Sequence, residues 1–385
     1  MIVKEGKVAI EVPDNHLKKA HFYNPRMELA RDLTILVLIA SQKKDFVACD
    51  ALAATGIRGI RIAKETQAKH VVVNDANDDI IPLIKKNVLL NNLTNVEVTN
   101  KDANILLFEN VKKFDYADID PFGTPVFYLE AAAKALRNEG IVGITATDTA
   151  CLSGTYPLVA LRKYGVKSFK TDFFKELGLR ILIKSIAQAF AKHDAAFIPL
   201  ISYAFEHYYR VFGRIEEGKR VASENLRKNL GYVAYCKKCL NRSISKEVTC
   251  KCDVCGARLI NIGPVWTGEI EDYRFVKKAE DVLPSLDWLK TSEEIKKLLS
   301  FLENESKVSL YYDVHKVCKV YGMNVPSFEV VIKKLRDAGY SVFRTHFCRT
   351  GIKTNANLKT FLNALECTKR LNSFTEARDI SPDYD

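Results

Sequence analysis

The chain has 385 residues, 47% of them hydrophobic and 27% charged, so its composition excludes a globally disordered protein and predicts two or three folded domains. Its 58 Lys and Arg residues outnumber its 47 Asp and Glu residues, and the net charge of +11 favours a polyanionic partner such as nucleic acid. The longest apolar run, residues 33–40, is far shorter than the ~20 residues that span a bilayer, so we expect a cytoplasmic protein with no membrane association and no secretory signal.

The first part of the chain predicts an α/β domain. Asn24 and Pro25 are typical of a helix start, and apolar residues at helical spacing predict a helix over residues 25–40. Between about residues 44 and 209, apolar strands alternate with amphipathic helices, which predicts a parallel, doubly wound sheet. The predicted strands are residues 46–49, 70–74, 95–99, 116–119 and 140–145, and the predicted helices are residues 59–66, 78–91 and 124–136.

The first predicted strand leads into a small-residue loop, within residues 46–59 (FVACDALAATGIRG), that would let the backbone approach a nucleotide closely. The dinucleotide fingerprint GxGxxG is not present, since the loop holds only Gly56 and Gly59. Asp75 closes the next strand, 75 − 56 = 19 residues after Gly56, where an acid would accept ribose hydroxyls. The alternative is an ordinary strand–helix turn that binds no ligand.

A further acid, Asp102, follows the third predicted strand. Its carboxylate could accept the amine hydrogens of an adenine, but such a residue is more often the N-cap of a helix.

Residues 118–125 (DIDPFGTP) are the most informative segment, because they follow the fourth strand and so lie at the carboxyl edge of the sheet, where open α/β folds bind ligands. Alkylation of an exocyclic base amine requires acceptors that hold its N–H groups and take up a proton. Asp120 and the carbonyl of Pro121 are suited to that role, and Phe122 to stacking on a flipped base. The alternative is a turn that begins a helix.

Five cysteines fall between residues 236 and 255. Cys236 and Cys239 form one CxxC pair, and Cys252 and Cys255 form a second, with 252 − 239 − 1 = 12 residues between the pairs. This spacing predicts a zinc ribbon in which four thiolates enclose a structural Zn²⁺ ion, with Cys250 as a possible competing ligand.

The last part of the chain is Lys-rich and helical. Ser327 is expected to cap a helix that ends near Gly339, and a strand over residues 341–347 follows, so we expect a winged-helix-like α+β module. Between residues 333 and 359 bases outnumber acids, since Asp337 is the only acid, which suits phosphate contacts. The alternative is a solvated basic face. The bases are Lys333, Lys334, Arg336, Arg344, Arg349, Lys353 and Lys359.

Several motifs in order along the chain resemble those of the tRNA guanine-26 N2-dimethyltransferase family. They are residues 24–26 (NPR), 54–59 (ATGIRG), 118–123 (DIDPFG), 145–148 (TATD), 344–347 (RTHF) and 350–354 (TGIKT). The resemblance implies a class I, Rossmann-like methyltransferase fold, S-adenosylmethionine as the methyl donor, and tRNA as the substrate. It covers nearly the whole chain.

The resemblance also implies a cofactor site. Arg31 and Arg58 would contact the methionine carboxylate, for which a guanidinium suits bidentate binding. Asp75 would accept the ribose hydroxyls, and Asp102 with Ala103 would meet the adenine edge.

For the target base, the resemblance makes Asp120 the catalytic acceptor, with Pro121 providing its carbonyl. Phe22 and Phe122 would enclose the guanine, and Asp148 would be a supporting carboxylate or, equally, an ordinary loop acid. In the C-terminal module, Arg344, His346 and Lys353 would bind tRNA.

These expectations divide the chain into a methyltransferase domain (residues 1–275) with an inserted zinc ribbon (232–260), a tRNA-binding domain (276–378) and a loose tail (379–385). No obligate protein partner is expected. Three other functions remain open from the residues: an amine methyltransferase for rRNA guanine or DNA adenine, a nicotinamide-dependent oxidoreductase, and a non-catalytic RNA-binding protein. The missing GxGxxG disfavours the second, and acids at four strand ends disfavour the third.

Overall fold

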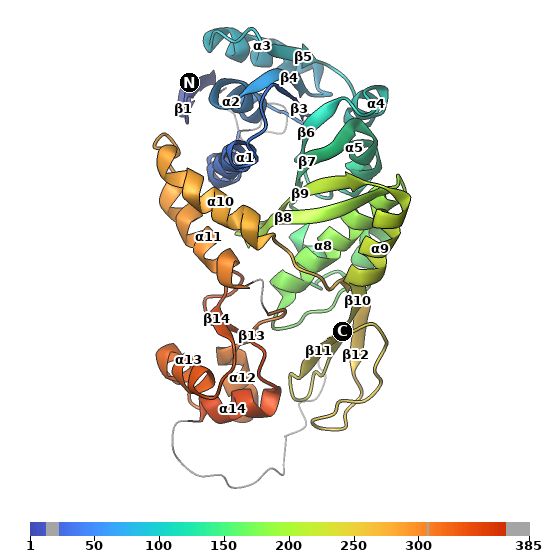
Figure 1. The fold of residues 1–385 in the computed structure, drawn as a ribbon, viewed down its shortest axis with the longest axis vertical. Coiled ribbons are helices and arrows are strands. Elements are labelled where there is room, and N and C mark those ends of the chain that lie inside the picture. The colour runs from blue at the N-terminus through green and yellow to red at the C-terminus, as the bar shows by residue number, and fades with distance from the viewer. Residues whose placement is uncertain (13–22, 306–307, 367–385) are drawn as a thin grey trace.

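The computed structural model describes residues 1–12, 23–305 and 308–366. The largest sheet in these residues has seven strands in the order β5-β4-β3-β6-β7-β9-β8 (Figure 1). The strands are β3 (Phe46–Asp50), β4 (Ala68–Asn74), β5 (Val96–Thr99), β6 (Phe114–Ile119), β7 (Leu136–Ala146), β8 (Ala195–Phe205) and β9 (Tyr208–Glu217). The five strands predicted from the sequence are all present.

The sheet is mixed, which corrects the prediction of a parallel sheet. β9 runs antiparallel to both of its neighbours, β7 and β8. Only two residues, Glu206 and His207, join β8 to β9, and a connection that short can only reverse the chain into a hairpin. The hairpin was missed because the sequence analysis assigned no strand between residues 146 and 217.

Helices cover both faces of the sheet, as the strand–helix alternation predicts. One face carries α1 (Glu28–Ala40), α2 (Ile57–Glu65) and α3 (Ile81–Leu90), together with α10 (Tyr273–Val282) and α11 (Ser292–Glu305). The other carries α4 (Ala103–Glu109), α5 (Leu129–Ala135), α8 (Phe174–Ala191) and α9 (Lys219–Asn229), with α6 (Thr149–Leu152) and α7 (Pro157–Tyr164) beside them.

The N-terminal segments comprise the turn that precedes α1 and a hairpin that packs against α3. Asn24 caps a short 3₁₀ turn, Pro25–Met27, by accepting a hydrogen bond from the backbone N–H of Arg26, and α1 continues from that turn. The hairpin of β1 (Ile2–Glu5) and β2 (Val8–Glu11) lies against α3, and the side chains of Asn87 on α3 and of Asn91 at its C-cap accept hydrogen bonds from the β2 backbone. Further 3₁₀ turns are Asp78–Ile80, Val126–Tyr128 and Leu283–Ser285.

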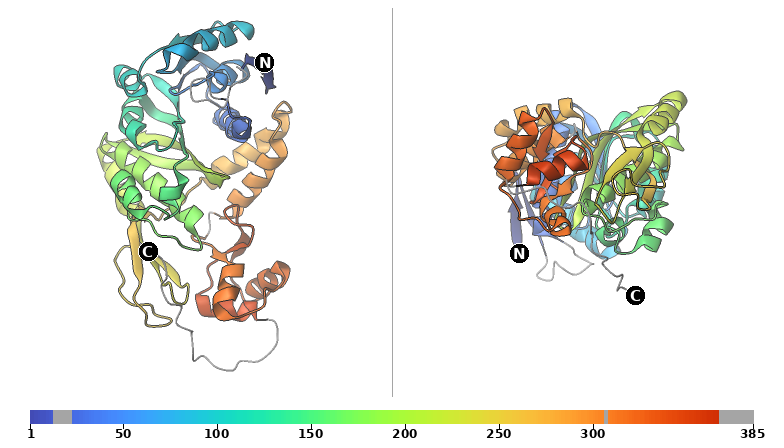
Figure 2. Two further views of the ribbon diagram at one scale, coloured as in Figure 1. Left: turned by 180° about the vertical axis from the view of Figure 1, so that it is seen from behind. Right: turned by 90° about the horizontal axis from the view of Figure 1, so that it is seen from below.

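The cysteine-rich segment forms a separate sheet of β10 (Leu230–Tyr235), β11 (Arg242–Ser245) and β12 (Ile260–Trp266) in the order β11-β10-β12. A C-terminal module follows α11, consisting of β13 (Tyr312–Asp313), α12 (Val314–Tyr321), α13 (Phe328–Asp337), β14 (Val342–Arg344), β15 (Gly351–Thr354) and α14 (Leu358–Leu365). The succession of α11, β13, α12, α13, β14 and β15 is winged-helix-like. The ribbon and this module lie side by side at the end of the molecule remote from α3 (Figures 1 and 2).

Two details at this end differ from expectation. The boundary expected between residues 275 and 276 falls inside α10, because Asp272 caps a helix that continues to Val282. Val276 of α10 and Leu299 of α11 share a hydrophobic core with Leu33 of α1, so both helices pack on the sheet domain. Ser327 occupies the N-cap of α13 as predicted, but its hydroxyl bonds Glu329 rather than a backbone N–H.

In the described ranges, no helix combines the length and the apolar character needed to cross a membrane. The expected tail, residues 379–385, and the stretch before it from residue 367 lie outside the described residues.

Candidate active site and zinc site

A cavity of about 580 Å³ opens at the carboxyl ends of β3, β4 and β6. β3 lies between β4 and β6, at the point where the strand order reverses direction, which is where open α/β sheets bind ligands. The cavity is lined by Tyr23, Asn24, Met27, Arg31, Asp50, Leu52, Ala53, Ala54, Thr55, Ile57, Arg58, Asp75, Ala76, Asn77, Ile80, Asp120, Pro121, Phe122, Tyr128 and Thr147. Its volume is in the range of small-molecule sites.

The Gly-containing loop forms one wall of the cavity. Gly56, at the N-cap of α2, has φ = +81°, a left-handed conformation that favours glycine. Asp75 fixes the loop, since its two carboxylate oxygens accept hydrogen bonds from the backbone N–H groups of Ala54 (2.8 Å) and Asn77 (2.9 Å). The predicted loop and its acid partner therefore do meet.

Beneath the loop, α2 lies very close to the sheet. A Cβ atom on Gly59 would come within 2.4 Å of Val73 Cγ2, so only glycine permits this approach. The Gly59 N–H donates to Asp50 Oδ2 at 2.9 Å. Burial, and next the charge of Asp118, raise the pKa of Asp50 to about 7.

A cluster of charged side chains lies at the cavity, and two of its members, Arg58 and Asp120, line it. Arg58 forms an ion pair with Asp120, lies 3.3 Å from Asp118 through Nε, and donates to Thr34 Oγ1 at 3.0 Å. Arg210, from β9, forms a second ion pair with Asp118. Burial alone would raise the pKa of Asp118, but the guanidinium groups of Arg210 and then Arg58 hold it below its ordinary value.

Within that cluster, Asp120 differs from the others in its access to solvent. Its side chain is 19% exposed, whereas those of Asp118 and Arg210 are fully buried and that of Arg58 is 7% exposed. We call these four residues, Arg58, Asp118, Asp120 and Arg210, the cavity cluster. Arg210 is the member that sequence analysis missed, because it comes from the unpredicted strand β9.

The loop after β6 is fixed to the loop after β7. The Gly123 N–H donates to Thr147 Oγ1 at 2.7 Å, and the Thr147 N–H donates to the Gly123 carbonyl at 2.9 Å. Gly123 has φ = +90°. Phe122 stands at the cavity wall with 60% of its surface exposed, so its ring is open to stacking on a ligand.

Arg31, predicted to contact the cofactor, is held by other partners in the structure. Arg31 lines the cavity, but its guanidinium binds Glu5 at 2.6 Å through both Nε and Nη2 and the Asn24 carbonyl at 3.2–3.3 Å. That leaves one Nη1 hydrogen for a ligand. Glu5 could not be found from sequence, since it lies on β1. Arg31 was expected to contact the methionine carboxylate of the cofactor, but its guanidinium already has an acidic partner in Glu5.

Asp102 and Ala103 are not among the residues that line the cavity. Asp102 is the N-cap of α4, where Oδ1 accepts from Asn104 N at 2.9 Å and from Ile105 N at 3.2 Å. Burial and then the charge of Asp102 raise the pKa of Tyr128, which lines the cavity.

Asp148 also points elsewhere. It accepts a hydrogen bond from the Tyr164 hydroxyl at 2.6 Å and lies 3.5 Å from Lys163 Nζ, on α7. Thr124 in turn donates to the Tyr164 hydroxyl at 2.9 Å, so Asp148 fixes the loops around the site rather than facing the cavity. Phe22 lies outside the described residues, and its neighbour Tyr23 lines the cavity.

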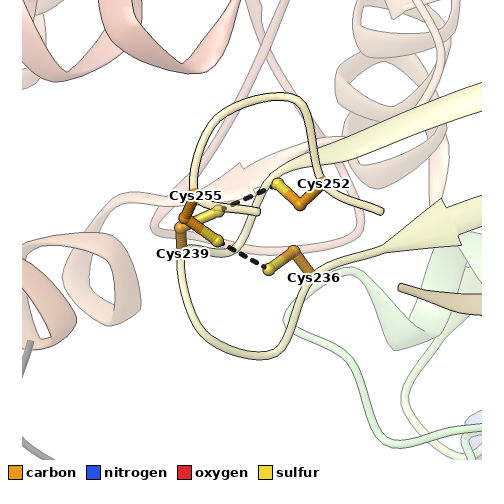
Figure 3. Close-up of side chains that lie close together, drawn as sticks. All are labelled: Cys236, Cys239, Cys252 and Cys255. Carbon is orange, nitrogen blue, oxygen red and sulfur yellow. Dashed lines mark hydrogen bonds between the residues drawn. The ribbon is translucent and has the colours of Figure 1, made fainter. Parts of the chain in front are cut away.

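The four predicted zinc ligands come together (Figure 3). The Sγ atoms of Cys236, Cys239, Cys252 and Cys255 all lie within 4.8 Å of one another, and the pairs 236–255 and 239–252 are 3.5 Å apart. A tetrahedral site with Zn–S bonds of ~2.3 Å requires sulfur–sulfur distances of about 3.8 Å, so the four thiols fit zinc. Cys250 is exposed and is not part of this group.

The C-terminal predictions need correction. Lys353 is only 1% exposed, and its Nζ lies 3.3 Å from Glu176 and 3.2 Å from Glu305, so it cannot reach a phosphate from this position. His346 is 5% exposed and bonds Glu305 at 3.0 Å through Nδ1. Arg344 is half-buried, with its guanidinium 4.1 Å from the ring centre of Phe328. The sequence pattern does not distinguish interior bases from surface bases.

Comparison with known proteins agrees with this geometry. The family model described as N2,N2-dimethylguanosine tRNA methyltransferase matches residues 6–366. A "tRNA (guanine(26)-N(2))-dimethyltransferase" from Methanosphaera stadtmanae is 38% identical over 370 residues, covering 93% of this chain and 94% of that protein. One of the same description from Methanopyrus kandleri is 38% identical over 371 residues, covering 94% and 95%.

A solved structure is also similar throughout. Trm1 from Pyrococcus horikoshii, determined in complex with S-adenosyl-L-methionine, superposes with a TM-score of 0.88 at 34% identity, covering 95% of this chain and 100% of that chain. The likeness confirms the predicted Rossmann-like methyltransferase fold. The chain therefore belongs to the family of N2,N2-dimethylguanosine tRNA methyltransferases.

Proposed function

We propose that this protein transfers methyl groups from S-adenosylmethionine to the exocyclic N2 of guanine 26 in tRNA, giving N2-methylguanosine and then N2,N2-dimethylguanosine. One observation carries the proposal: Asp120, in a DPFG loop, faces the same cavity as the Gly56 loop and Asp75. Family membership over residues 6–366 supports the choice of reaction and substrate.

The cavity suits a nucleoside-containing cofactor. Asp75 already binds two backbone N–H groups, but a carboxylate has further lone pairs with which to accept ribose hydroxyls. We assign the adenine edge to Asp102 and Ala103. We assign the methionine carboxylate to Arg58 and Arg31, which would have to exchange part of their present bonds to Asp120 and Glu5. When bound, the cofactor would supply an electrophilic methyl group.

Asp120 would act on the target amine. The N2 lone pair of guanine is delocalised into the ring, so the amine becomes a nucleophile only as it pyramidalises, and hydrogen-bond acceptors favour that change. Asp120 would accept one N–H and take up the proton as the N–C bond forms, and the Pro121 carbonyl would accept the other. In the structure Arg58 forms an ion pair with Asp120 at the cavity wall. Phe122, together with Phe22, would stack on the base.

For tRNA binding we propose the exposed bases of the C-terminal module in place of Lys353 and His346. Lys333 and Arg336 on α13 and Arg349 in the β14–β15 loop are exposed. Arg344 lies over Phe328 and donates a hydrogen bond to the Arg349 carbonyl. Bases of this kind bind phosphates by releasing counterions. Affinity for tRNA should therefore fall steeply as salt rises.

We further propose that the four thiols hold one structural zinc ion per chain. Four protein ligands close the coordination shell and leave no open catalytic position. Elemental analysis of the purified protein should find about one zinc per chain, and a metal-free, stable protein would refute the site. A tRNA methyltransferase is also expected to reside with its substrate, so we propose a cytoplasmic location.

The decisive experiment is methyl transfer to two tRNA transcripts that differ only in whether residue 26 is guanine, followed by nucleoside analysis. We expect N2-methyl- and N2,N2-dimethylguanosine from the first transcript alone. Equal methylation of both transcripts would move the target base elsewhere, and no transfer to either would refute the reaction. Binding of S-adenosylmethionine but not NAD, measured by calorimetry, would separate a methyltransferase from an oxidoreductase.

A further inference from the structure

The loop that carries Cys236 and Cys239, which we call the first knuckle, makes contacts with parts of the protein outside the zinc ribbon. Arg242 follows this knuckle directly and is 3% exposed. It donates to the Leu240 carbonyl through Nε at 3.2 Å and Nη2 at 2.9 Å, which fixes it to the knuckle backbone. Its Nη2 also lies 2.6 Å from Asp172, just before α8 of the sheet domain. One buried side chain thus joins the ribbon to the sheet domain.

The same knuckle also holds the C-terminal module. Arg242 Nη1 donates to the Tyr311 carbonyl, and the guanidinium lies 4.0 Å from the ring centre of Tyr312, the first residue of β13. From the end of α12, the Tyr321 hydroxyl donates to the carbonyl of Cys239, itself one of the four thiol residues, at 3.0 Å. The positions of β13 and α12 in the module therefore depend on the position of the knuckle backbone.

The position of the knuckle in turn depends on its thiols. The knuckle is a tight loop, closed by a hydrogen bond from the Leu240 N–H to the Cys236 carbonyl at 2.9 Å, and Leu240 has φ = +61°. It meets the second knuckle through the Sγ pairs 236–255 and 239–252. Neutral thiols form only weak hydrogen bonds, whereas four thiolates on one metal ion form a cross-link that can carry the fold of a small domain.

We propose that zinc binding in the ribbon sets the position of the C-terminal module, and that Arg242 and Tyr321 transmit it. Both are positioning residues, since they touch neither the cavity nor the proposed base. The inference rests on the proposed zinc site and on the proposed tRNA surface of the module. It predicts that zinc is needed for tRNA affinity but not for binding of S-adenosylmethionine in a cavity on another part of the fold.

The first test uses the full-length protein with and without zinc, prepared with a strong chelator and then restored with zinc. Hydrogen exchange should show the backbone amides of α12 and β13 exchanging at least about 10-fold faster without zinc, because local opening becomes easier. S-adenosylmethionine affinity should change less than about 2-fold, and zinc should restore slow exchange. Unchanged exchange in α12 after verified zinc loss would overturn the inference.

The second test leaves all four thiols in place, so it does not depend on a zinc-free protein that stays folded. Tyr321→Phe removes one hydrogen bond, which should weaken tRNA affinity about 3- to 10-fold and raise KM with little change in kcat. Arg242→Gln should weaken it more, and Arg242→Lys should restore part of the loss. Each variant should retain one zinc per chain.

Two matched controls define specificity. Cys250→Ser removes an exposed cysteine outside the group of four, and Tyr340→Phe removes a tyrosine hydroxyl in the same module that makes none of the contacts above. Neither should alter exchange or tRNA affinity. If Tyr321→Phe and Tyr340→Phe behave alike, the inference is wrong. If the wild-type protein methylates no tRNA, the proposed function fails, while the exchange measurement still decides whether zinc positions the module.

Discussion

Two clusters of buried charge lie in different regions of this molecule. The cavity cluster (Arg58, Asp118, Asp120 and Arg210) lies at the carboxyl edge of the sheet. A second group, which we call the junction cluster, connects α8, α11 and the C-terminal module. It consists of Glu176, Arg180, Glu305, His346 and Lys353, with Glu305 receiving hydrogen bonds from Thr345 and His346. Both bring together residues that are far apart in the sequence.

The two clusters differ in access. Asp120 is 19% exposed and faces a cavity, whereas every side chain of the junction cluster is at most 5% exposed. In both, burial of charge is costly and is offset by partners of opposite sign. In the junction cluster, burial would raise the pKa of Glu305, but His346 and then Lys353 hold it at about 2. Buried charge by itself therefore does not mark a catalytic site; one group must also be open to a ligand.

The largest expected effect is at the open member of the cavity cluster. Asp120→Ala removes the proposed acceptor, so methyl transfer should fall by roughly 10²–10⁴-fold or more, the usual contribution of a general base. Single-turnover transfer to tRNA measures this loss. S-adenosylmethionine affinity, measured by calorimetry, should remain within a few-fold of wild type, because Asp75 and the Gly56 loop are untouched.

Asp120→Asn controls for the loss of side-chain shape in Asp120→Ala, since it keeps the shape and one acceptor oxygen but cannot take up the proton. It should also be defective in transfer. Turnover near the wild-type rate in either variant would show that Asp120 is not the acceptor.

The next effect concerns the closed cluster and should appear in stability. Lys353→Met leaves Glu176 and Glu305 without their shared ammonium, which should lower the free energy of unfolding by about 3–5 kcal/mol. Lys359→Met, at an exposed position nearby on α14, should change it by less than about 0.5 kcal/mol. Denaturant unfolding of both variants measures the contrast. Equal stability would show that the junction cluster does not stabilise the fold.

The third effect is in the pH dependence of stability, and it is the smallest when expressed per pH unit. Glu271 lies beside the junction cluster, near Lys353, Glu305, Arg180 and Glu176. Its carboxyl oxygens are buried and have no hydrogen-bond partner in the described part of the chain. Burial is the main cause that raises its pKa to about 8, from an ordinary value of 4.5. Between these pH values the folded protein keeps a proton that the unfolded chain releases.

Folding that takes up a proton becomes less favourable as pH rises, so Glu271 should lower the free energy of unfolding by up to ~1.4 kcal/mol per pH unit between about pH 4.5 and 8. Glu271→Gln removes this dependence. The wild-type and variant stability curves, measured by denaturant unfolding at several pH values, should therefore differ in slope across this window and run parallel above it. Parallel curves throughout would contradict a protonated Glu271.

Local sequence predicted much of this fold because local rules set it. The small-residue turn at Gly56, the acid Asp75 and the loop at Asp120 follow three parallel strands that are neighbours in the sheet, β3, β4 and β6, and the carboxyl ends of such strands must share one edge. In the same way, two CxxC pairs at short spacing can bring four thiols together without help from the rest of the fold. These were the residues that sequence reasoning brought correctly to one place.

Only the tertiary structure decided which charged side chains that are distant in the sequence form ion pairs. Glu5 binds Arg31, Arg210 binds Asp118, and two glutamates from α8 and α11 enclose Lys353. A basic residue looks the same in sequence whether it faces solvent or a buried carboxylate, because the partner comes from another element. Sequence by itself thus determined the chemistry available at the strand ends and the cluster of four thiols. Long-range packing decided which of the charged side chains remain open to a ligand.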